Sequence, residues 1–433
     1  MTIPSTYKVA KLSDYVYYQE GPGIRNYQNT TEGINFLNIR CFVNGRLDTA
    51  SMKKVAESEA FGKYRHFLLD VGDYVVSSSG TLGRIAEVYP EDLPVMLNTS
   101  TIRFRPIDNS LLDRLYLRYF LESEVFQQQV TSLATGSVQL NYGPSHLAFV
   151  EMPLPPIEIQ IAIGKVLDSI TRKIELNSQS SKTLEDIAQT IFKSWFIDFD
   201  PVKAKMAGEK PEGMDDATAA LFPDSMEESE LGLIPKGWEV RKIESLCQTL
   251  LGGTPSRTKD DFWDGEIPWI NSGKVNEFRI TTASEYITEL GLEKSATKLL
   301  PKGTTVLAIT GATLGQFSRL EIDSCANQSV VGILGSDEAS NEFIYFNIKN
   351  GINRLVSAQT GGAQQHINKE DVNEFLIVYP GKKLMDAMTD VVSAMFADIG
   401  ALSHQSNCLA EIRNSLLPRL ISGELKIPEE MLA

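Results

Sequence analysis

Two long stretches of the chain place apolar residues at alternating steps of four and three positions. The first runs from Pro155 to Phe196, and its seam reads Ile163, Leu167, Ile170, Ile174, Asn177, Ser181, Leu184, Ala188, Ile191 and Trp195. This heptad pattern, which is polar only in its middle, predicts a long α-helix that packs against a second helix. Some forty helical residues at ~1.5 Å each would extend about 60 Å. A helix of that length needs a partner to cover its apolar side.

The second stretch, from Lys382 to about Leu425, supplies that partner. A shift of 225 positions brings Ile174 onto Ile399 and Ser181 onto Ser406, so the polar interruption falls at the same place in both stretches. Two ordinary core helices are the alternative interpretation, but two matched runs at one spacing favour an antiparallel pair. The residues predicted to pair the helices are Ile163, Leu167, Ile170, Ile174, Asn177, Ser181, Leu184, Ile191, Met395, Ile399, Leu402, Ser406, Leu409 and Leu416.

The similarity between the two halves extends beyond the helices. LLDVGDYVVSSSGTLG (68–83) matches LLPKGTTVLAITGATLG (299–315), and TGSVQLNYGPSHLAFVEMPLP (135–155) matches TGGAQQHINKEDVNEFLIVYP (360–380). Matching blocks in the same order indicate a tandem duplication. Each copy mixes short β-branched and aromatic runs with Gly-marked turns and one further helix, at 111–133 and 340–358. We therefore predict an α+β fold: two tandem-repeated mixed α/β domains separated by two long antiparallel coiled-coil helices, with pseudo-two-fold symmetry.

The duplication also gives domain limits. The segment after the first long helix is rich in Pro, Gly and acidic residues, a composition that predicts an irregular or partly mobile linker. The expected parts are a first domain at 1–155, a helix at 156–197, the linker at 198–236, a second domain at 237–380, a second helix at 381–425 and a tail at 426–433.

Composition is that of a globular protein. The 433 residues favour two or three domains, and 42% hydrophobic with 22% charged residues is ordinary for soluble proteins. The N-terminal residues do not resemble a signal peptide, and no uncharged run approaches the ~18 apolar residues of a membrane span. The four cysteines are isolated from one another and from the histidines. We expect reduced thiols, a cytoplasmic location, no metal and no cofactor.

A formal net charge of −15 argues against a duplex-binding protein, which usually has a basic surface. Much of the excess is local, because residues 198–230 contain ten Asp and Glu but only three Lys. Without this segment, the two halves are only mildly acidic.

The turns best suited to contact DNA are polar and marked by Gly. Gly permits close approach to a phosphate, Asn and Gln can pair with adenine, and Arg with guanine. Alternatively, the Gly turns only preserve hairpin geometry, and two alternating arginines only form a solvated strand face. The candidate DNA-binding residues are Ser79, Gly80, Thr81, Arg84, Arg103, Arg105, Gln139, Asn141, Thr310, Gly311, Thr313, Gln316, Gln364, Gln365, His366 and Asn368.

Motifs for catalysis are missing from the sequence. The four histidines are scattered, and there is no G-x-x-x-x-G-K-[ST] phosphate loop. Neither a nuclease-like carboxylate cluster nor a methyl-donor pocket is recognisable. We predict no catalytic residues and interpret the chain as a recognition protein.

The whole chain resembles the specificity subunit of type I restriction-modification systems. The resemblance rests on the duplicated domain-plus-helix plan and on four segments spread along the chain: LPPIEIQIAIGKVLDSITRKIELN (154–177), TLEDIAQTIFKSWFIDFDPVKAKMAG (183–208), PEGMDDATAALFPDSMEESELGLIPKGWEV (211–240) and IRNSLLPRLISGEL (412–425).

This resemblance implies a DNA sequence-specificity subunit without catalysis of its own. Each globular domain would be a target recognition domain for one half of a bipartite, asymmetric site in double-stranded DNA. The long helices would set the spacer and dock two methyltransferase (M) subunits. Restriction (R) subunits would join for ATP-dependent cleavage, and adenine methylation and cutting would belong to these partners. No membrane is implied.

Two other interpretations stay open at this point. The complex could be one that only methylates DNA, without restriction subunits. Less in keeping with the motifs, the chain could be a coiled-coil scaffold whose globular ends bind proteins. A single-chain restriction enzyme is disfavoured because its catalytic motifs are missing.

Overall fold

The computed structural model describes residues 6–43, 45–135, 140–357 and 366–431. The chain divides into two compact units, one of residues 1–174 with 408–433 and one of residues 175–407. Each long helix contributes one part of its length to each unit.

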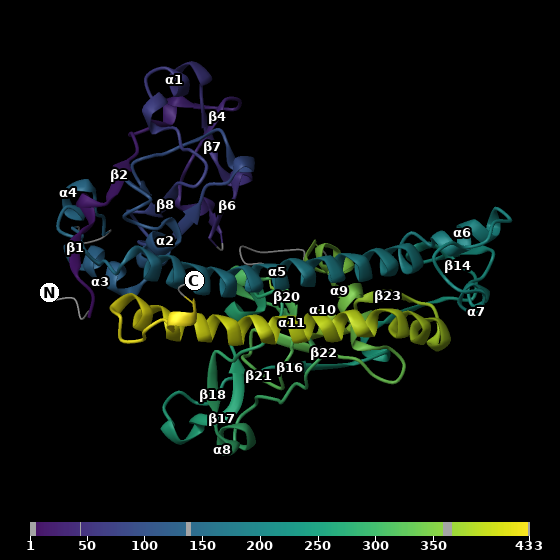
Figure 1. The fold of residues 1–433 in the computed structure, drawn as a ribbon. Helices are drawn as coiled ribbons and strands as arrows, with labels where there is room; N and C mark the ends of the chain where they lie inside the picture. Colours follow the sequence, from purple (N-terminus) through teal and green to yellow (C-terminus); the bar gives the residue numbers. More distant parts are fainter. Residues whose placement is uncertain (1–5, 44, 136–139, 358–365, 432–433) are drawn as a thin grey trace. The chain divides into compact units, whose positions relative to one another are not determined.

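The first unit is built on two small sheets and two strand pairs (Figure 1). The antiparallel sheet has the order β2-β11-β8-β9, with strands Val16–Glu20, Thr101–Pro106, Tyr74–Ser77 and Ile85–Glu87. The second sheet has the order β10-β4-β7-β3, with strands Val95–Met96, Ile34–Phe36, Lys53–Val55 and Asn29–Thr30. Two further pairs are β1 (Val9–Lys11) with β12 (Glu151–Pro153) and β5 (Phe42–Val43) with β6 (Arg46–Leu47).

Strand β8 is buried on both faces, which explains its unbroken apolar character. Tyr74 and Val76 point into a core shared with α2 (Arg114–Glu122) and α3 (Glu124–Leu133). Val75, between them, points into a separate core on the opposite face, as the period of two requires. Short helices α1 (Glu57–Phe61) and α4 (Pro144–Leu147) complete the domain.

The second unit repeats most of this topology, although its second sheet has three strands where that of the first unit has four. Its sheet β16-β22-β19-β20 consists of Gln248–Leu251, Val330–Leu334, Thr305–Ala308 and Phe317–Arg319. Its sheet β18-β17-β21 consists of Glu285–Ile287, Trp263–Ile270 and Cys325–Ala326, and β15 (Glu239–Lys242) pairs with β23 (Leu376–Tyr379). The helices of this domain are α8 (Glu289–Glu293), α9 (Asn341–Ser357) and α10 (Lys369–Asn373).

The duplication extends to strand direction. In each unit, the second sheet contains one parallel pairing, β4 with β10 and β17 with β21, and its other strand pairings are antiparallel. The predicted α+β fold with two tandem mixed α/β domains is confirmed.

Helix α5 spans Ile157–Phe196 and helix α11 spans Lys382–Ser422. Helix α5 begins directly after Pro155 and Pro156, which lack the N–H groups that a helix start leaves unpaired. In the first unit, Ile163 and Leu167 of α5 share a core with Leu417 and Leu420 of α11. In the second unit, Ala188 and Phe192 near the end of α5 share a core with Met388 and Val392 near the start of α11. The two helices are therefore antiparallel.

The segment after α5 is folded, contrary to the expectation of an irregular linker. It forms α6 (Asp200–Met206), α7 (Asp216–Ala220) and a hairpin of β13 (Met226–Ser229) and β14 (Gly232–Pro235). Val202, Phe222 and Ile234 are buried in the core of the second unit, beside Trp195 and Trp238. The average composition of the segment is acidic, so composition alone did not indicate that these few apolar residues are core residues. Within the described residues, no helix is long and apolar enough to cross a membrane.

Phe192 should be among the most important core residues of the second unit. It is fully buried, and its ring centroid lies 5.3 Å from that of Phe196, 5.8 Å from Phe343 and 5.2 Å from Phe346. We expect Phe192→Ala to lower the free energy of unfolding by about 3–5 kcal/mol, measured by urea denaturation. The control is Ile187→Ala on the same helix, where the side chain is 44% exposed and the change should stay within about 0.5 kcal/mol. Equal losses in both variants would contradict the packing described.

Candidate nucleic-acid interface

The first candidate turn follows strand β8 and is closed by one serine. The Ser77 hydroxyl donates to the Thr81 carbonyl oxygen over 2.6 Å and accepts from the Arg84 N–H over 2.9 Å. Gly80 and Gly83 have φ values of 74° and 76°, a left-handed conformation that favours glycine. These two glycines therefore serve the geometry of the turn. The side chains of Thr81 and Arg84 are exposed and Ser79 is half-buried.

The second candidate turn of the first unit lies against the first. The backbone N–H of Tyr142 donates to the Ser78 carbonyl over 3.0 Å, and Ser79 and Asn141 form an isolated antiparallel bridge. Asn141 also exchanges two backbone hydrogen bonds with Thr135. The structure thus brings Asn141 together with Ser79, although they are distant in sequence. Gln139 lies outside the described residues.

The second unit shows the same arrangement. The N–H of Ile367 donates to the Ile309 carbonyl over 2.9 Å, which is the counterpart of the bond from Tyr142 to Ser78. His366 and Asn368 therefore flank the turn that contains Thr310, Gly311 and Thr313. Gln316 and His366 are exposed, and Thr310 and Thr313 are half-buried. Gln364 and Gln365 lie outside the described residues.

Asn368 has a structural task. Its Oδ1 accepts the N–H of Asp371 over 2.9 Å, and its own N–H donates to Asp371 Oδ2 over 2.8 Å. This reciprocal pair is a capping box at the start of α10. Sequence reasoning missed it, although Asn followed three residues later by Asp is a recognisable start of a helix.

Of the two alternating arginines, Arg103 is buried in the domain and Arg105 is half-buried. Arg103 is 7% exposed and donates to the carbonyl oxygens of Leu68 and His66 over 2.8 and 2.9 Å. Arg105 pairs with Asp70 and Asp73 over 2.9 and 2.8 Å. Burial raises the pKa of Asp73 even though both arginines oppose this shift. Neither the predicted phosphate contact nor a solvated strand face describes Arg103, because the 66–68 loop covers that face of the sheet.

A basic lobe, which we define as residues 24–67, escaped the sequence reasoning. It contains seven Lys and Arg against four Asp and Glu, in a chain of net charge −15. Arg25, Arg40, Lys53, Lys63 and Arg65 are exposed here. A sliding charge window would have found the lobe. Positive charge at this density suits the phosphate backbone of DNA.

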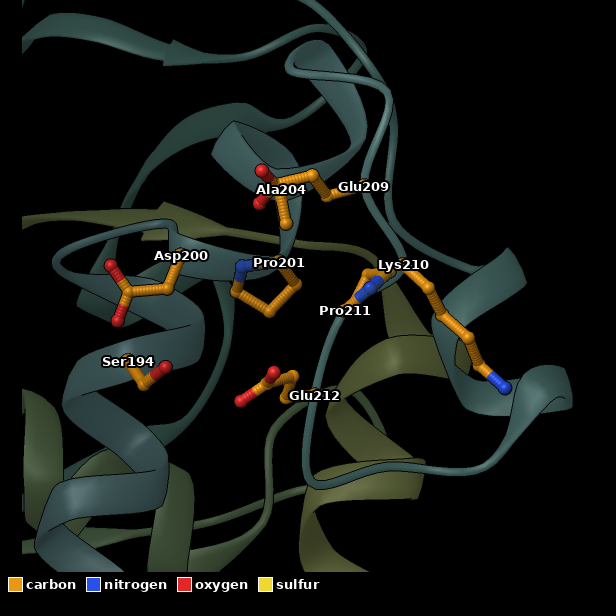
Figure 2. Close-up of a pocket in the computed structure, with 8 residues that line it drawn as sticks. All are labelled: Ser194, Asp200, Pro201, Ala204, Glu209, Lys210, Pro211 and Glu212. Carbon is orange, nitrogen blue, oxygen red and sulfur yellow. The ribbon is translucent and has the colours of Figure 1, made fainter.

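An open cavity near the C-terminal end of α5 has the opposite character. It measures about 690 Å³ and is lined by Ser194, Asp200, Pro201, Ala204, Glu209, Lys210, Pro211 and Glu212 (Figure 2). Lys210 points away from the cavity and pairs with Asp216 over 2.5 Å, which leaves the lining acidic. Carboxylates repel phosphates, so the cavity does not belong to a DNA interface.

Each of the fourteen predicted pairing residues is buried or half-buried. In the second unit, Asn177 Nδ2 donates to Gln405 Oε1 over 2.8 Å and to Ser406 Oγ over 3.3 Å. A polar contact in an otherwise apolar seam favours one register over its neighbours.

Groups of three His, Cys, Asp or Glu side chains that could hold a metal ion do not occur among the described residues.

Comparison with known proteins finds one family. The model of the "Type I restriction modification DNA specificity domain" matches residues 4–186 and again residues 235–397. The HindI specificity subunit of the type I restriction enzyme of Haemophilus influenzae is 28% identical over 410 residues, 84% of either chain. The MjaIX specificity subunit from Methanocaldococcus jannaschii is 24% identical over 362 residues, 83% of this chain and 78% of the relative. The crystal structure of a type I S subunit from M. genitalium aligns with a TM-score of 0.57 at 14% identity over 97% of both chains, and so shares the fold.

The two asparagines of the candidate turns should differ in their effect on stability. Because Asn368 caps a helix, Asn368→Ala should lower the free energy of unfolding by about 1 kcal/mol. Asn141→Ala should change it by less than about 0.5 kcal/mol, since the Asn141 side chain is exposed. Urea denaturation of the two variants makes the comparison. A larger loss for Asn141→Ala would show that its side chain, too, is structural.

Proposed function

This chain belongs to the family of type I restriction-modification DNA specificity domains, and on that premise we propose that it selects the DNA site of a type I restriction-modification complex. One observation carries the proposal. The turn geometry that joins Ser78 to Tyr142 recurs between Ile309 and Ile367, within the two segments that match the family. A chain with two copies of one exposed polar surface suits a ligand that is read in two parts.

Each domain then reads one half of a bipartite site in double-stranded DNA. The first surface presents Thr81, Arg84 and Asn141, and the second presents Gln316 and His366. These side chains differ in their hydrogen-bonding groups, so the two half-sites differ in sequence and the whole site is asymmetric. Backbone groups at Gly80 and Gly311 contact phosphates.

The basic lobe supplies phosphate contacts for the first half-site. Phosphate contacts fix position, whereas base contacts specify sequence. This division removes the conflict between an acidic chain and a polyanionic ligand, because the acidic segment 198–230 is a separate folded element on the other unit.

The long helices set the spacer between the half-sites. Their 40 and 41 residues correspond to about 60 Å of helix each. The contact of Asn177 with Ser406 fixes their register. Lengthening the pair therefore lengthens the accepted spacer.

The outer faces of the helices dock two methyltransferase subunits. Leu176 and Ile187 of α5 are 55% and 44% exposed and lie eleven residues apart, close to three full turns, so they share one side of the helix. Exposed apolar side chains on one helix side mark a surface for protein contact.

Restriction subunits join this complex for ATP-dependent cleavage. The chain itself recognises DNA and performs no catalysis. Its four free cysteines suit a cytoplasmic location.

The direct test is to produce the chain together with the methyltransferase subunits of its own complex and to map the methylated adenines in the host DNA. We expect one bipartite motif with a fixed spacer. Methylation without any sequence preference, or none at all, would refute the proposed function.

Single substitutions should relax one half-site at a time. Asn141→Ala should lower discrimination at one base of the first half-site by about 1–3 kcal/mol, because one bidentate contact contributes that much. Gln316→Ala should do the same in the second half-site. Each variant is the control of the other, and methylation of a library of altered sites gives the measurement. Relaxation of both half-sites by one variant would contradict separate reading.

An insertion in α5 should change the spacer alone. Four residues added after Ser178 add ~6 Å of helix, which equals one or two base pairs of DNA at about 3.4 Å each. The expected result is a longer gap between two unchanged half-sites, measured by the same mapping. Four residues added after Glu230, in the turn of the β13–β14 hairpin, should leave the gap as it is. An unchanged spacer after the first insertion would exclude the helices as the ruler.

A further inference from the structure

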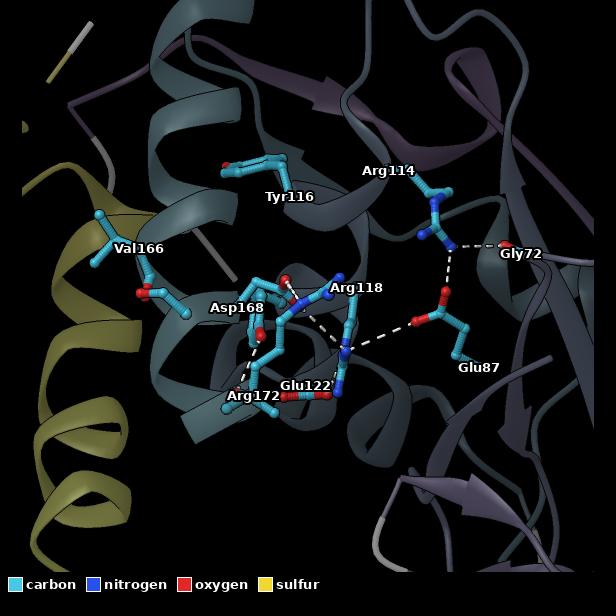
Figure 3. Close-up of polar contacts among 12 residues, drawn as sticks. Gly72, Glu87, Arg114, Tyr116, Arg118, Glu122, Val166, Asp168 and Arg172 are labelled. Atoms are coloured by element: carbon cyan, nitrogen blue, oxygen red, sulfur yellow. Dashed lines mark hydrogen bonds and ion pairs between the residues drawn. The ribbon is translucent and has the colours of Figure 1, made fainter. Parts of the chain in front are cut away.

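A buried ion cluster joins the first recognition domain to helix α5 (Figure 3). Arg118 of α2, whose side chain is 9% exposed, lies at its centre. Its guanidinium is 3.1 Å from Glu122 on the same helix, 3.6 Å from Asp168 on α5 and 3.7 Å from Glu87 on β9. One side chain therefore ties a helix and a strand of the domain to the long helix.

The charges in this cluster balance. Arg114 pairs with Glu87 over 2.7 Å, and Arg172 pairs with Asp168 over 2.5 Å, so three arginines face three carboxylates. Beside the cluster, the Tyr119 hydroxyl donates to Thr171 Oγ1 of α5 over 3.1 Å. The Arg172 side chain is 72% exposed and that of Arg114 is 38% exposed, whereas Arg118, Asp168 and Glu87 are largely buried. The buried pairs at the centre tolerate only a narrow range of geometries, because charges moved apart in a dry site lose much of their attraction.

The second recognition domain is joined to the same helix by other residues. Glu185 of α5 pairs with Arg279 over 2.7 Å and with Lys349 over 2.5 Å, and it accepts from the Tyr345 hydroxyl over 3.0 Å. Burial alone would raise the pKa of Glu185, but Arg279 and Lys349 outweigh it and lower the pKa below its usual value. Glu185 is therefore an ionised carboxylate inside the unit.

Duplication does not explain these contacts. The shift of 225 that relates the long helices carries Asp168 to Ser393 and Glu185 to Ala410, neither of which is acidic. The two clusters thus have separate origins in the sequence, yet both end on a carboxylate of α5. Apolar side chains would hold the domains to the helix at least as firmly, since buried ion pairs add little net stability. What the charged pairs add is a defined orientation of each domain relative to α5.

We propose that Asp168 and Glu185 are positioning residues that fix the orientation of each recognition domain on α5, and that this orientation determines how strictly the spacer is read. The proposal rests on the proposed function. In this view, helix length sets the preferred spacer, and the ion clusters determine how sharply neighbouring spacers are rejected.

The test uses the full chain assembled with its methyltransferase subunits and a set of DNA sites whose spacer is shortened or lengthened by one and two base pairs. Asp168→Asn keeps the shape of the side chain and leaves Arg118 paired with Glu122 and Glu87. We expect methylation at the neighbouring spacers to rise about tenfold relative to the preferred one, the factor typical of one charged contact. Half-site sequence preference should not change. Glu185→Gln should broaden the spacer in the same way.

The matched control is Glu122→Gln. It removes an equal charge from the same guanidinium, but within the recognition domain, so spacer preference should stay that of the original chain. An unchanged spacer in Asp168→Asn overturns the proposal. Equal broadening by Glu122→Gln also overturns it, because general loosening would then be the cause.

A second variant keeps the test decisive if Asp168→Asn fails to fold. Thr171→Val removes only the contact with the Tyr119 hydroxyl and should broaden the spacer in the same direction by a smaller factor. Unchanged spacer preference in that variant then overturns the proposal. If the original chain methylates no bipartite motif, the proposed function is contradicted. If it methylates a bipartite motif and the variants keep the original spacer preference, only the positioning role is contradicted.

Discussion

The apolar seam of the long helices is the constraint on which the rest of the structure depends. A single helix of 40 residues with one apolar stripe is unstable in water unless another surface covers the stripe. Here the two copies of the duplicated sequence cover each other, so the fold needs both copies. The recognition domains then attach to helices that are already paired, which gives each domain a firm base in its own unit.

Features encoded by local spacing were predictable from the sequence. Periodicity along the chain predicted the long helices and the strand-rich domains. Repetition of similar blocks in the same order predicted the duplication. Features that depend on distant neighbours were not. Arg103 looks like a solvent-facing strand residue until the 66–68 loop covers it, and Asp168 looks like a surface helix residue until Arg118 reaches it. Nothing in the sequences of the candidate turns indicates that the two turns of one unit lie against each other. Only the fold brings Asn141 to Ser79.

Charge in this chain is segregated. Averaged over all residues it is strongly acidic, yet residues 24–67 are basic and residues 198–230 carry much of the negative excess. Net charge is therefore a poor guide to whether a surface can meet a polyanion, because electrostatic attraction in salt acts over about 10 Å and is felt by the nearest lobe. Average composition is an equally poor guide to folding in the acidic segment, because three buried apolar residues suffice to attach it to the core of its unit.

The bond from Tyr142 to Ser78 and its counterpart from Ile367 to Ile309 are made by main-chain atoms alone. Such bonds are indifferent to the side chains that the same residues and their exposed neighbours carry. Exposed side chains at these positions, such as those of Thr81, Arg84 and Asn141, can therefore change while the backbone stays in place. If the turns read DNA as proposed, a lineage could acquire new sequence preferences by substitution of these exposed side chains without loss of the scaffold.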